Sequence, residues 1–166
     1  MSIVDQARDH ARDAHYDQFD LAGEPYINHV ETVVSLVKEM TDDEYTIAIA
    51  WLHDVIEDTE DTVIDLETQG YPKEVIEGVS QLTREKGYPY KQYISEITDE
   101  RSKIVKICDL LHNQDDRRLP SEKRNTERRY KYHQAIISLV GETDEATELL
   151  KKYNKFMKTD IDVEGG

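Results

Sequence analysis

The chain has 166 residues, 37% of them hydrophobic and 34% charged, which is typical of one globular domain large enough to bury its own core. Its formal net charge of −15 disfavours a nucleic-acid polymer as a partner, because phosphates would repel it. No apolar run could span a bilayer, the polar N-terminus is not a signal peptide, and the single Cys108 excludes an intrachain disulfide, so we expect a cytoplasmic protein without membrane contact.

Apolar residues recur at helical spacing along nearly the whole chain. Ser2 is a suitable N-cap for the first helix, and Pro25 suits the first turn of the second, because its missing N–H costs nothing there. Asp42 is the predicted N-cap of a third helix, which is apolar on nearly all sides and is therefore expected at the centre of the fold. The predicted helices cover residues 2–18, 25–40, 42–56, 62–70, 71–82, 90–97, 100–114, 121–141 and 143–158.

No stretch alternates apolar and polar residues as a strand would, and the sequence contains no repeat or low-complexity segment. The pattern therefore predicts an all-α protein, a single-domain helical bundle that covers residues 1–158. Residues 159–166 lack any periodicity and are predicted to form a flexible C-terminal tail.

Two histidines and two aspartates, His29, His53, Asp54 and Asp109, form a candidate metal site. Imidazole and carboxylate together suit Mn²⁺, Fe²⁺, Co²⁺ or Zn²⁺, and four protein ligands in an octahedron leave two positions open. Three of these residues stand in apolar surroundings, where an uncompensated charge would be costly to bury. A divalent transition metal would supply the compensation. His112 could reach the same ion, but we interpret it as a supporting or packing residue.

More carboxylates follow the His53-Asp54 pair along the chain. Residues four apart share a helix face, so a continuous third helix would place Glu57 beside His53 and Asp58 beside Asp54. Carboxylates in that position can orient and deprotonate a water molecule, which hydrolysis requires. The acids from Glu60 onward fit a solvated loop.

Positive charge is concentrated in one part of this acidic chain. Residues 101–131 contain ten Lys/Arg and five Asp/Glu, a local charge of +5. Such a segment could face an anionic small ligand, or it could be a solvated helix face that balances its neighbours. Because the segment contains Asp109, the first interpretation would bring the positive charge to the candidate metal site.

Four motifs in a fixed order carry a family resemblance. They are GEPYINH at 23–29, LHDVIEDT at 52–59, VIEGVSQLT at 75–83 and KICDLLHN at 106–113. Together they resemble the HD phosphohydrolase superfamily, and more narrowly the hydrolase domain of the RelA/SpoT alarmone enzymes and the stand-alone small alarmone hydrolases. The resemblance extends over roughly residues 5–140 and implies an HD-domain helical bundle.

The resemblance implies a Mn²⁺-dependent enzyme that removes pyrophosphate from the ribose 3′ position of (p)ppGpp or (p)ppApp, so the expected partner is a small-molecule nucleotide. Glu57 and Asp58 would activate the attacking water. The metal ligands implied by the resemblance are His29, His53, Asp54 and Asp109. The implied substrate-binding residues are Lys86, Asn113, Arg128 and Tyr132.

The chain also departs from the family pattern. Asp20 and Leu21 stand where the family has an Arg-Lys pair, Leu110 replaces an arginine, and Asp115 replaces another. The pair contacts the base and phosphates in the family, so its absence predicts weaker guanine selectivity, with adenine analogues hydrolysed at comparable kcat/KM. Another arginine, such as Arg12 or Arg84, could restore the selectivity.

Two other functions are compatible with this sequence. One is an HD phosphohydrolase that acts on another nucleotide, either as a 5′-nucleotidase or as an NADPH-type phosphatase. The other is a non-catalytic regulatory protein that keeps the HD fold. The presence of Glu57 and Asp58 disfavours the second, because binding alone needs no group to activate water.

Overall fold

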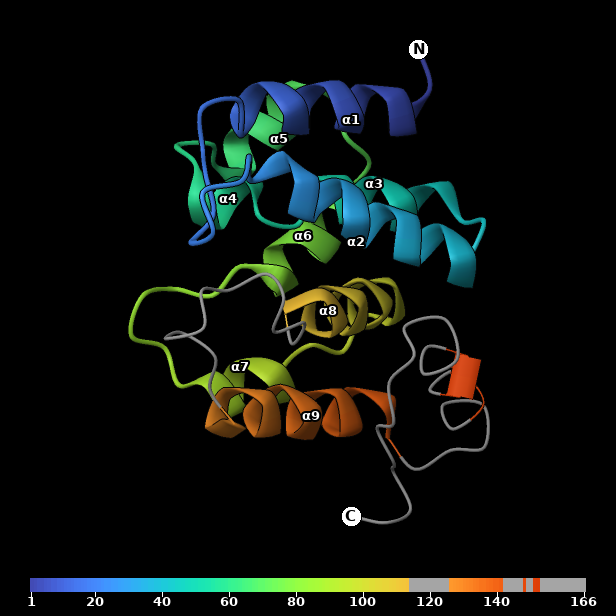
Figure 1. Cartoon of the computed structure of the whole chain (residues 1–166). Coiled ribbons are helices and arrows are strands. Elements are labelled where there is room, and N and C mark those ends of the chain that lie inside the picture. Colours follow the sequence, from blue (N-terminus) through green and yellow to red (C-terminus); the bar gives the residue numbers. More distant parts are fainter. Residues whose placement is uncertain (114–125, 142–147, 149–150, 153–166) are drawn as a thin grey trace.

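The computed structural model describes residues 1–113, 126–141, 148 and 151–152, and within them the predicted all-α fold is confirmed (Figure 1). These residues form helices and no strand, apart from an isolated bridge between Phe19 and Pro25. The helices are α1 (Ile3–Ala14), α2 (Ile27–Met40), α3 (Glu44–Leu52), α4 (Val55–Asp58), α5 (Val63–Thr68), α6 (Lys73–Leu82), α7 (Tyr90–Ser95), α8 (Glu100–Asn113) and α9 (Thr126–Val140).

Helix α3 lies at the centre of the fold, as its composition predicts, and packs against α1, α2, α6 and α8. Every residue from Thr46 to Leu52 is buried. Helix α6 approaches α3 so closely that a Cβ at Gly78 would collide with the side chain of Ile49. The hydroxyl of Ser102 on α8 donates to the carbonyl of Gly78 at 2.9 Å, which joins the same helix to α8.

Helix α8 connects the two parts of the bundle. It packs against α2, α3 and α6 on one side and against α9 on the other. Figure 1 shows α7 and α9 on the side of α8 that lies away from α1. Residues of α8 in the middle of the molecule, among them Asp109, are therefore surrounded by protein on several sides and are buried.

The first connection is longer than predicted. Ser2 caps α1, since its hydroxyl accepts from the Asp5 amide at 3.1 Å, but the helix ends at Ala14 and not at residue 18. The amide of Tyr26 donates to the carbonyl of Gln18 at 2.8 Å, so α2 begins at Ile27, two residues later than predicted. The chain between the two helices thereby forms a loop.

The predicted continuation of the third helix through residue 56 is wrong. Helix α3 ends at Leu52, and α4 begins after Asp54, whose φ of −106° and ψ of 1° are not helical. Nδ1 of His53 contacts the carbonyl of Ala50 at 2.7 Å, and this is the acceptor that the Asp54 amide would need to continue the helix. The resulting turn directs His53 and Asp54 into the interior.

The N-cap of α3 is Asp43 and not Asp42 as predicted. Its Oδ2 accepts from the Thr46 amide at 3.0 Å and from Nε of Arg101 at 2.8 Å. Partial burial by itself would raise the pKa of Asp43, but these hydrogen bonds and the Arg101 charge outweigh it and lower the pKa. We expect Asp43→Ala to lower the free energy of unfolding by about 1 kcal/mol at neutral pH, as measured by urea denaturation.

Asp42→Ala provides the matched control for this cap, because Asp42 is the neighbouring aspartate and, like Asp43, is exposed. It should change the unfolding free energy by less than about 0.5 kcal/mol. Because the folded pKa of Asp43 is depressed, the contribution of the cap is present above the unfolded pKa of about 3.9 and is lost as the pH falls through the folded value. Equal effects of the two substitutions on the unfolding free energy would show that Asp43 is not the cap.

The later helices follow the prediction with small differences. Thr62 caps α5 in a capping box with Asp65, and α7 ends at Ser95, two residues early. The helix predicted over 143–158 and the tail over 159–166 lie outside the described residues, except residues 148, 151 and 152, so the boundary between domain and tail stays a prediction. No helix in the described part is long and apolar enough to cross a membrane.

Candidate metal centre and active site

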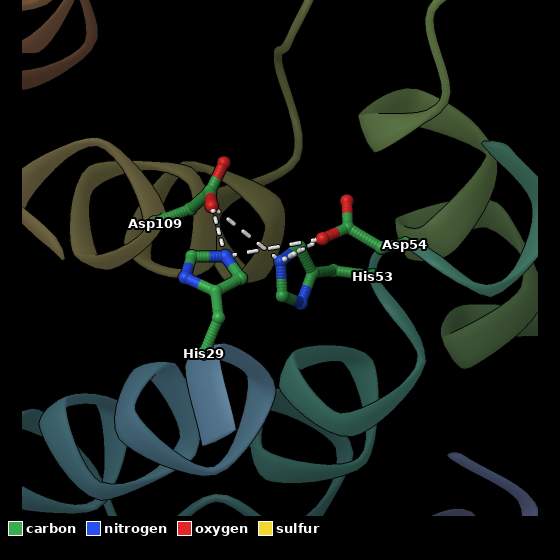
Figure 2. A group of neighbouring side chains, drawn as sticks. All are labelled: His29, His53, Asp54 and Asp109. Carbon is green, nitrogen blue, oxygen red and sulfur yellow. Dashed lines mark hydrogen bonds and ion pairs between the residues drawn. The ribbon is translucent and has the colours of Figure 1, made fainter. Parts of the chain in front are cut away.

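The four predicted metal ligands meet at one point in the interior. His29 comes from α2, His53 and Asp54 from the turn between α3 and α4, and Asp109 from α8. Figure 2 shows the four side chains pointing toward one another from these separate elements. All four residues are buried, with at most 8% of their surface exposed.

The ligand atoms have the spacing that a single ion needs. Nε2 of His29 lies 2.9 Å from Oδ1 of Asp109, and Nε2 of His53 lies 3.0 Å from Oδ2 of Asp54. The two crosswise distances are 3.9 Å from His29 to Asp54 and 3.6 Å from His53 to Asp109. Neighbouring ligands about 2.1 Å from one ion lie about 3 Å apart, so the cluster would need only small adjustments.

The orientation of the His53 ring supports the same assignment. Its Nδ1 contacts the carbonyl of Ala50, which only a protonated nitrogen can do as a donor, so in the neutral ring Nε2 carries the lone pair. Nε2 is buried, and among the described residues it has no hydrogen-bond partner. A buried nitrogen that faces two carboxylates and makes no hydrogen bond is an atom that a metal ion would satisfy.

His112 supports His29 from behind, in the role that the sequence suggested for it. Nδ1 of His112 lies 2.7 Å from Nδ1 of His29, and the two rings are stacked with centroids 5.0 Å apart. If Nδ1 of His29 donates to His112, Nε2 of His29 is left as an acceptor directed at the cluster. His112 therefore orients a candidate ligand without facing the cluster itself.

The charges in the cluster also favour a cation. Burial opposes ionisation of Asp54 and Asp109, but His53 lowers the pKa of Asp54 to about 2, and Lys106 with His29 lowers the pKa of Asp109 well below its usual value. Burial likewise opposes charge on His53, yet the two carboxylates raise its pKa well above 6.5. A proton and a metal ion would therefore compete for Nε2 of this histidine.

Sequence reasoning missed two residues that hold the carboxylates. Nζ of Lys106 lies 3.0 Å from Oδ2 of Asp109, which leaves Oδ1 directed at the histidines. The hydroxyl of Tyr26 donates to Oδ2 of Asp54. The spacing of Lys106 three residues before Asp109 on a helix could have indicated the first contact. Nothing local predicts the second, because Tyr26 and Asp54 meet only in the folded chain.

Glu57 and Asp58 lie at the open side of the cluster. Oxygen atoms of Asp54, Glu57 and Asp58 lie within 4.8 Å of one another. Oε1 of Glu57 accepts from the backbone amide of Arg84 at 2.9 Å, which fixes one side of the carboxylate. Partial burial, followed by the charge of Asp54, raises the pKa of Asp58 to about 6, and partial burial also raises the pKa of Glu57. Asp58 can therefore accept a proton near neutral pH, and Glu57 holds a proton more readily than an ordinary glutamate does.

The predicted substrate residues are less closely grouped. Nδ2 of Asn113 donates to Oδ1 of Asp109 at 3.1 Å, so Asn113 adjoins the cluster. Tyr132 is half-buried on α9, and Lys86 is exposed on the loop between α6 and α7 without a hydrogen bond or ion pair to another described residue. Arg128 belongs to α9, but its side chain lies outside the described part of the structure.

The donor set fits a divalent metal. Two imidazole nitrogens and two carboxylate oxygens converge from three parts of the fold, and one of these nitrogens, Nε2 of His53, is buried without a hydrogen bond to a described residue. With two further carboxylates on the open side, the arrangement can hold an ion and position a water molecule next to it. His10 and His15 lie outside the group, and His10 pairs with Asp61 at 2.7 Å.

Comparisons with known proteins agree with this geometry. Residues 7–139 match the family model of the HD domain. The chain is 40% identical over 115 residues to the bifunctional (p)ppGpp synthase/hydrolase SpoT of Escherichia coli K12, and 37% identical over 114 residues to the guanosine-3′,5′-bis(diphosphate) 3′-pyrophosphohydrolase of Haemophilus influenzae. These matches cover 62% of this chain but only 16% and 17% of the relatives, so the chain spans about a sixth of their length.

A solved structure extends the comparison to nearly the whole chain. It is described as a metazoan ortholog of SpoT that hydrolyzes ppGpp and plays a role in starvation responses. The two structures superimpose with a TM-score of 0.72 at 25% sequence identity, covering 94% of this chain and 96% of the other. With the family model matching most of its length and this fold in common, the chain belongs to the HD-domain family.

Proposed function

We propose that the protein is a metal-dependent nucleotide phosphohydrolase, a Mn²⁺ enzyme that releases pyrophosphate from the 3′ position of (p)ppGpp or (p)ppApp. The observation that carries the proposal is the buried group of His29, His53, Asp54 and Asp109, with the carboxylates of Glu57 and Asp58 on its open side. The names of the relatives support the choice of substrate, since two of them describe guanosine-3′,5′-bis(diphosphate) or (p)ppGpp hydrolysis.

Different residues of the site would have separate roles in this reaction. A bound divalent metal supplies charge stabilisation for the phosphoryl group. Glu57 or Asp58 accepts a proton from the attacking water, whose oxygen bonds to the phosphorus attached to O3′ as that P–O bond breaks. The leaving 3′-oxygen takes up a proton, so the products are pyrophosphate and a free 3′-hydroxyl. Lys106 and Asn113 keep Asp109 in place throughout.

The loop before α2 bears on recognition of the base. Oδ1 of Asp20 accepts from the amides of Ala22 and Glu24 at 2.9 and 3.0 Å, so this carboxylate shapes its own loop, and the neighbouring Leu21 is 71% exposed. Neither residue offers the flat cationic fork that an arginine would present to a purine. We therefore infer that guanine is read weakly and that adenine analogues are substrates as well.

The decisive experiment is a substrate panel with the purified, Mn²⁺-loaded protein. Guanosine 3′,5′-bis(diphosphate), its adenine analogue, NADPH and nucleoside monophosphates would be incubated separately and the products resolved by chromatography. We expect pyrophosphate release from both bis(diphosphates) at comparable kcat/KM. A guanine preference beyond about a hundredfold, some 2.7 kcal/mol, would overturn the inference on selectivity.

The same panel distinguishes the other functions. Exclusive release of phosphate from NADPH or from a nucleoside monophosphate would identify a phosphohydrolase of another nucleotide. No turnover of any compound by protein that retains its metal would identify a binding protein. Either result would replace the proposed activity, while the family and the fold would stand.

Arg128 is predicted to contact the phosphates of the substrate. If it does, Arg128→Ala should raise KM for guanosine 3′,5′-bis(diphosphate) by about tenfold, as for loss of a hydrogen bond to a charged group, and change KM for a nucleoside monophosphate less. Arg101→Ala is the control, because Arg101 lies in the same basic segment but pairs with Asp43. Equal changes of KM for both nucleotides would show that Arg128 is only a surface charge outside the phosphate site.

A further inference from the structure

Cationic side chains gather around two tyrosines of α7. Nζ of Lys131 on α9 lies 3.9 Å from the centre of the Tyr90 ring, and Cζ of Arg84 lies 5.5 Å from the same centre. Nζ of Lys106 lies 5.3 Å from the ring of Tyr93. Aromatic rings attract cations, so each of these charges is held in place at a ring.

The charge of this group is not balanced within the described part of the chain. Lys106 pairs with Asp109, whereas Arg84 and Lys131 form no ion pair with any residue that the structure describes. Partial burial, followed by repulsion from Arg84 and Lys106, lowers the pKa of Lys131. Holding like charges together raises the free energy, and an anion placed between them would lower it. Such a group of positive charges is unlike the chain as a whole, whose net charge is −15.

The group is accessible and borders the candidate active site. The backbone amide of Arg84 donates to Glu57, one of the proposed catalytic carboxylates, at 2.9 Å. Tyr90 and Lys131 also line a pocket of about 440 Å³ between α7 and α9. The Tyr90 hydroxyl is buried and has no hydrogen-bond partner among the described residues, so this residue keeps an unused donor.

We propose that Arg84, Lys131 and Tyr90 form an anion-binding subsite for a diphosphate group that is not cleaved. The inference rests on the proposed function, because a bis(diphosphate) nucleotide carries two such groups and the metal centre would receive only the one at the 3′ position. The 5′-diphosphate then needs a separate cationic partner. Arg84 and Lys131 offer two positive charges beside the carboxylate that would activate water.

Guanosine 5′-diphosphate tests this subsite without any reaction, because it lacks the 3′-diphosphate. The full chain would be loaded with one equivalent of Mn²⁺, dialysed, and titrated calorimetrically with guanosine 5′-diphosphate and with guanosine. We expect the diphosphate to bind at least about tenfold more tightly than guanosine. Arg84→Gln and Lys131→Gln should each remove most of that difference.

Lys73→Gln is the matched control, since it removes the same charge from an exposed side chain on α6. It should leave the affinity for guanosine 5′-diphosphate within about twofold of the original. The subsite is refuted if the wild-type chain does not prefer the diphosphate over guanosine, if Arg84→Gln and Lys131→Gln bind it as the wild type does, or if Lys73→Gln weakens it equally.

Failure of the subsite and failure of the proposed function give different results. If the chain binds guanosine 5′-diphosphate through Arg84 and Lys131 but hydrolyses no bis(diphosphate), the subsite stands and the activity is wrong. If the bis(diphosphate) is hydrolysed with unchanged KM in both glutamine variants, the activity stands and the subsite is wrong.

Discussion

Asp109→Asn should remove the bound metal and lower kcat/KM for the bis(diphosphate) by about 10³-fold. The amide keeps the size of the carboxylate but removes a negative charge from a group of four candidate ligands. It also takes the negative charge away from the partly buried Lys106, whose Nζ lies 3.0 Å from Oδ2 of Asp109. The loss of Lewis-acid stabilisation worth about 4 kcal/mol corresponds to this factor. Metal content would be measured by atomic spectroscopy after dialysis, beside steady-state kinetics.

Stability provides a second measurement for the same variant. An ion that binds only the folded chain stabilises it by about 2.7 kcal/mol at a hundred times its Kd. Added Mn²⁺ should therefore raise the Tm of the wild-type chain and leave the Tm of Asp109→Asn unchanged. Asp61→Asn is the control, because Asp61 also pairs with a histidine, His10, but outside the cluster. Full metal content in Asp109→Asn would show that the metal is held elsewhere.

The sequence predicted most of the fold because the signals for helices are local. Ser2 and Thr62 cap the helices that they were expected to cap, and the apolar third helix is central. The errors come from contacts between side chain and backbone that propensity does not include. Asp43 and not Asp42 reaches the Thr46 amide, and the His53 ring takes the carbonyl that would have continued α3.

The candidate site likewise contains some residues that the sequence predicts and some contacts that it does not. His29, His53, Asp54 and Asp109 could be predicted to meet because each stands in a distinctive local motif, and the structure brings them together. Their role as metal ligands stays a prediction. The contact of Tyr26 with Asp54 and the contact of Lys131 with Tyr90 join residues far apart in the sequence. No local pattern specifies such contacts, because they depend on how α2, α7 and α9 pack.

The interruption between α3 and α4 determines where Glu57 and Asp58 lie. Because α4 starts anew after Asp54, Glu57 and Asp58 are not simply one turn further along a straight helix. The turn leaves both side chains open to solvent while their oxygen atoms stay near Asp54. They can therefore contact water and substrate at the mouth of the site, whereas Asp54 itself is buried.

Glu57→Gln should therefore retain the metal and lower kcat by about 10²–10⁴-fold, the contribution of a positioned general base. The amide can still accept the hydrogen bond from the Arg84 backbone at 2.9 Å, so the local structure should persist. Glu60→Gln, an exposed acid on the following loop, is the control and should retain full activity. Wild-type turnover by Glu57→Gln would leave Asp58 as the base, because its pKa of about 6 allows it to accept a proton at neutral pH. Asp58→Asn should then show the loss instead, and full activity in both variants would place the base outside this pair.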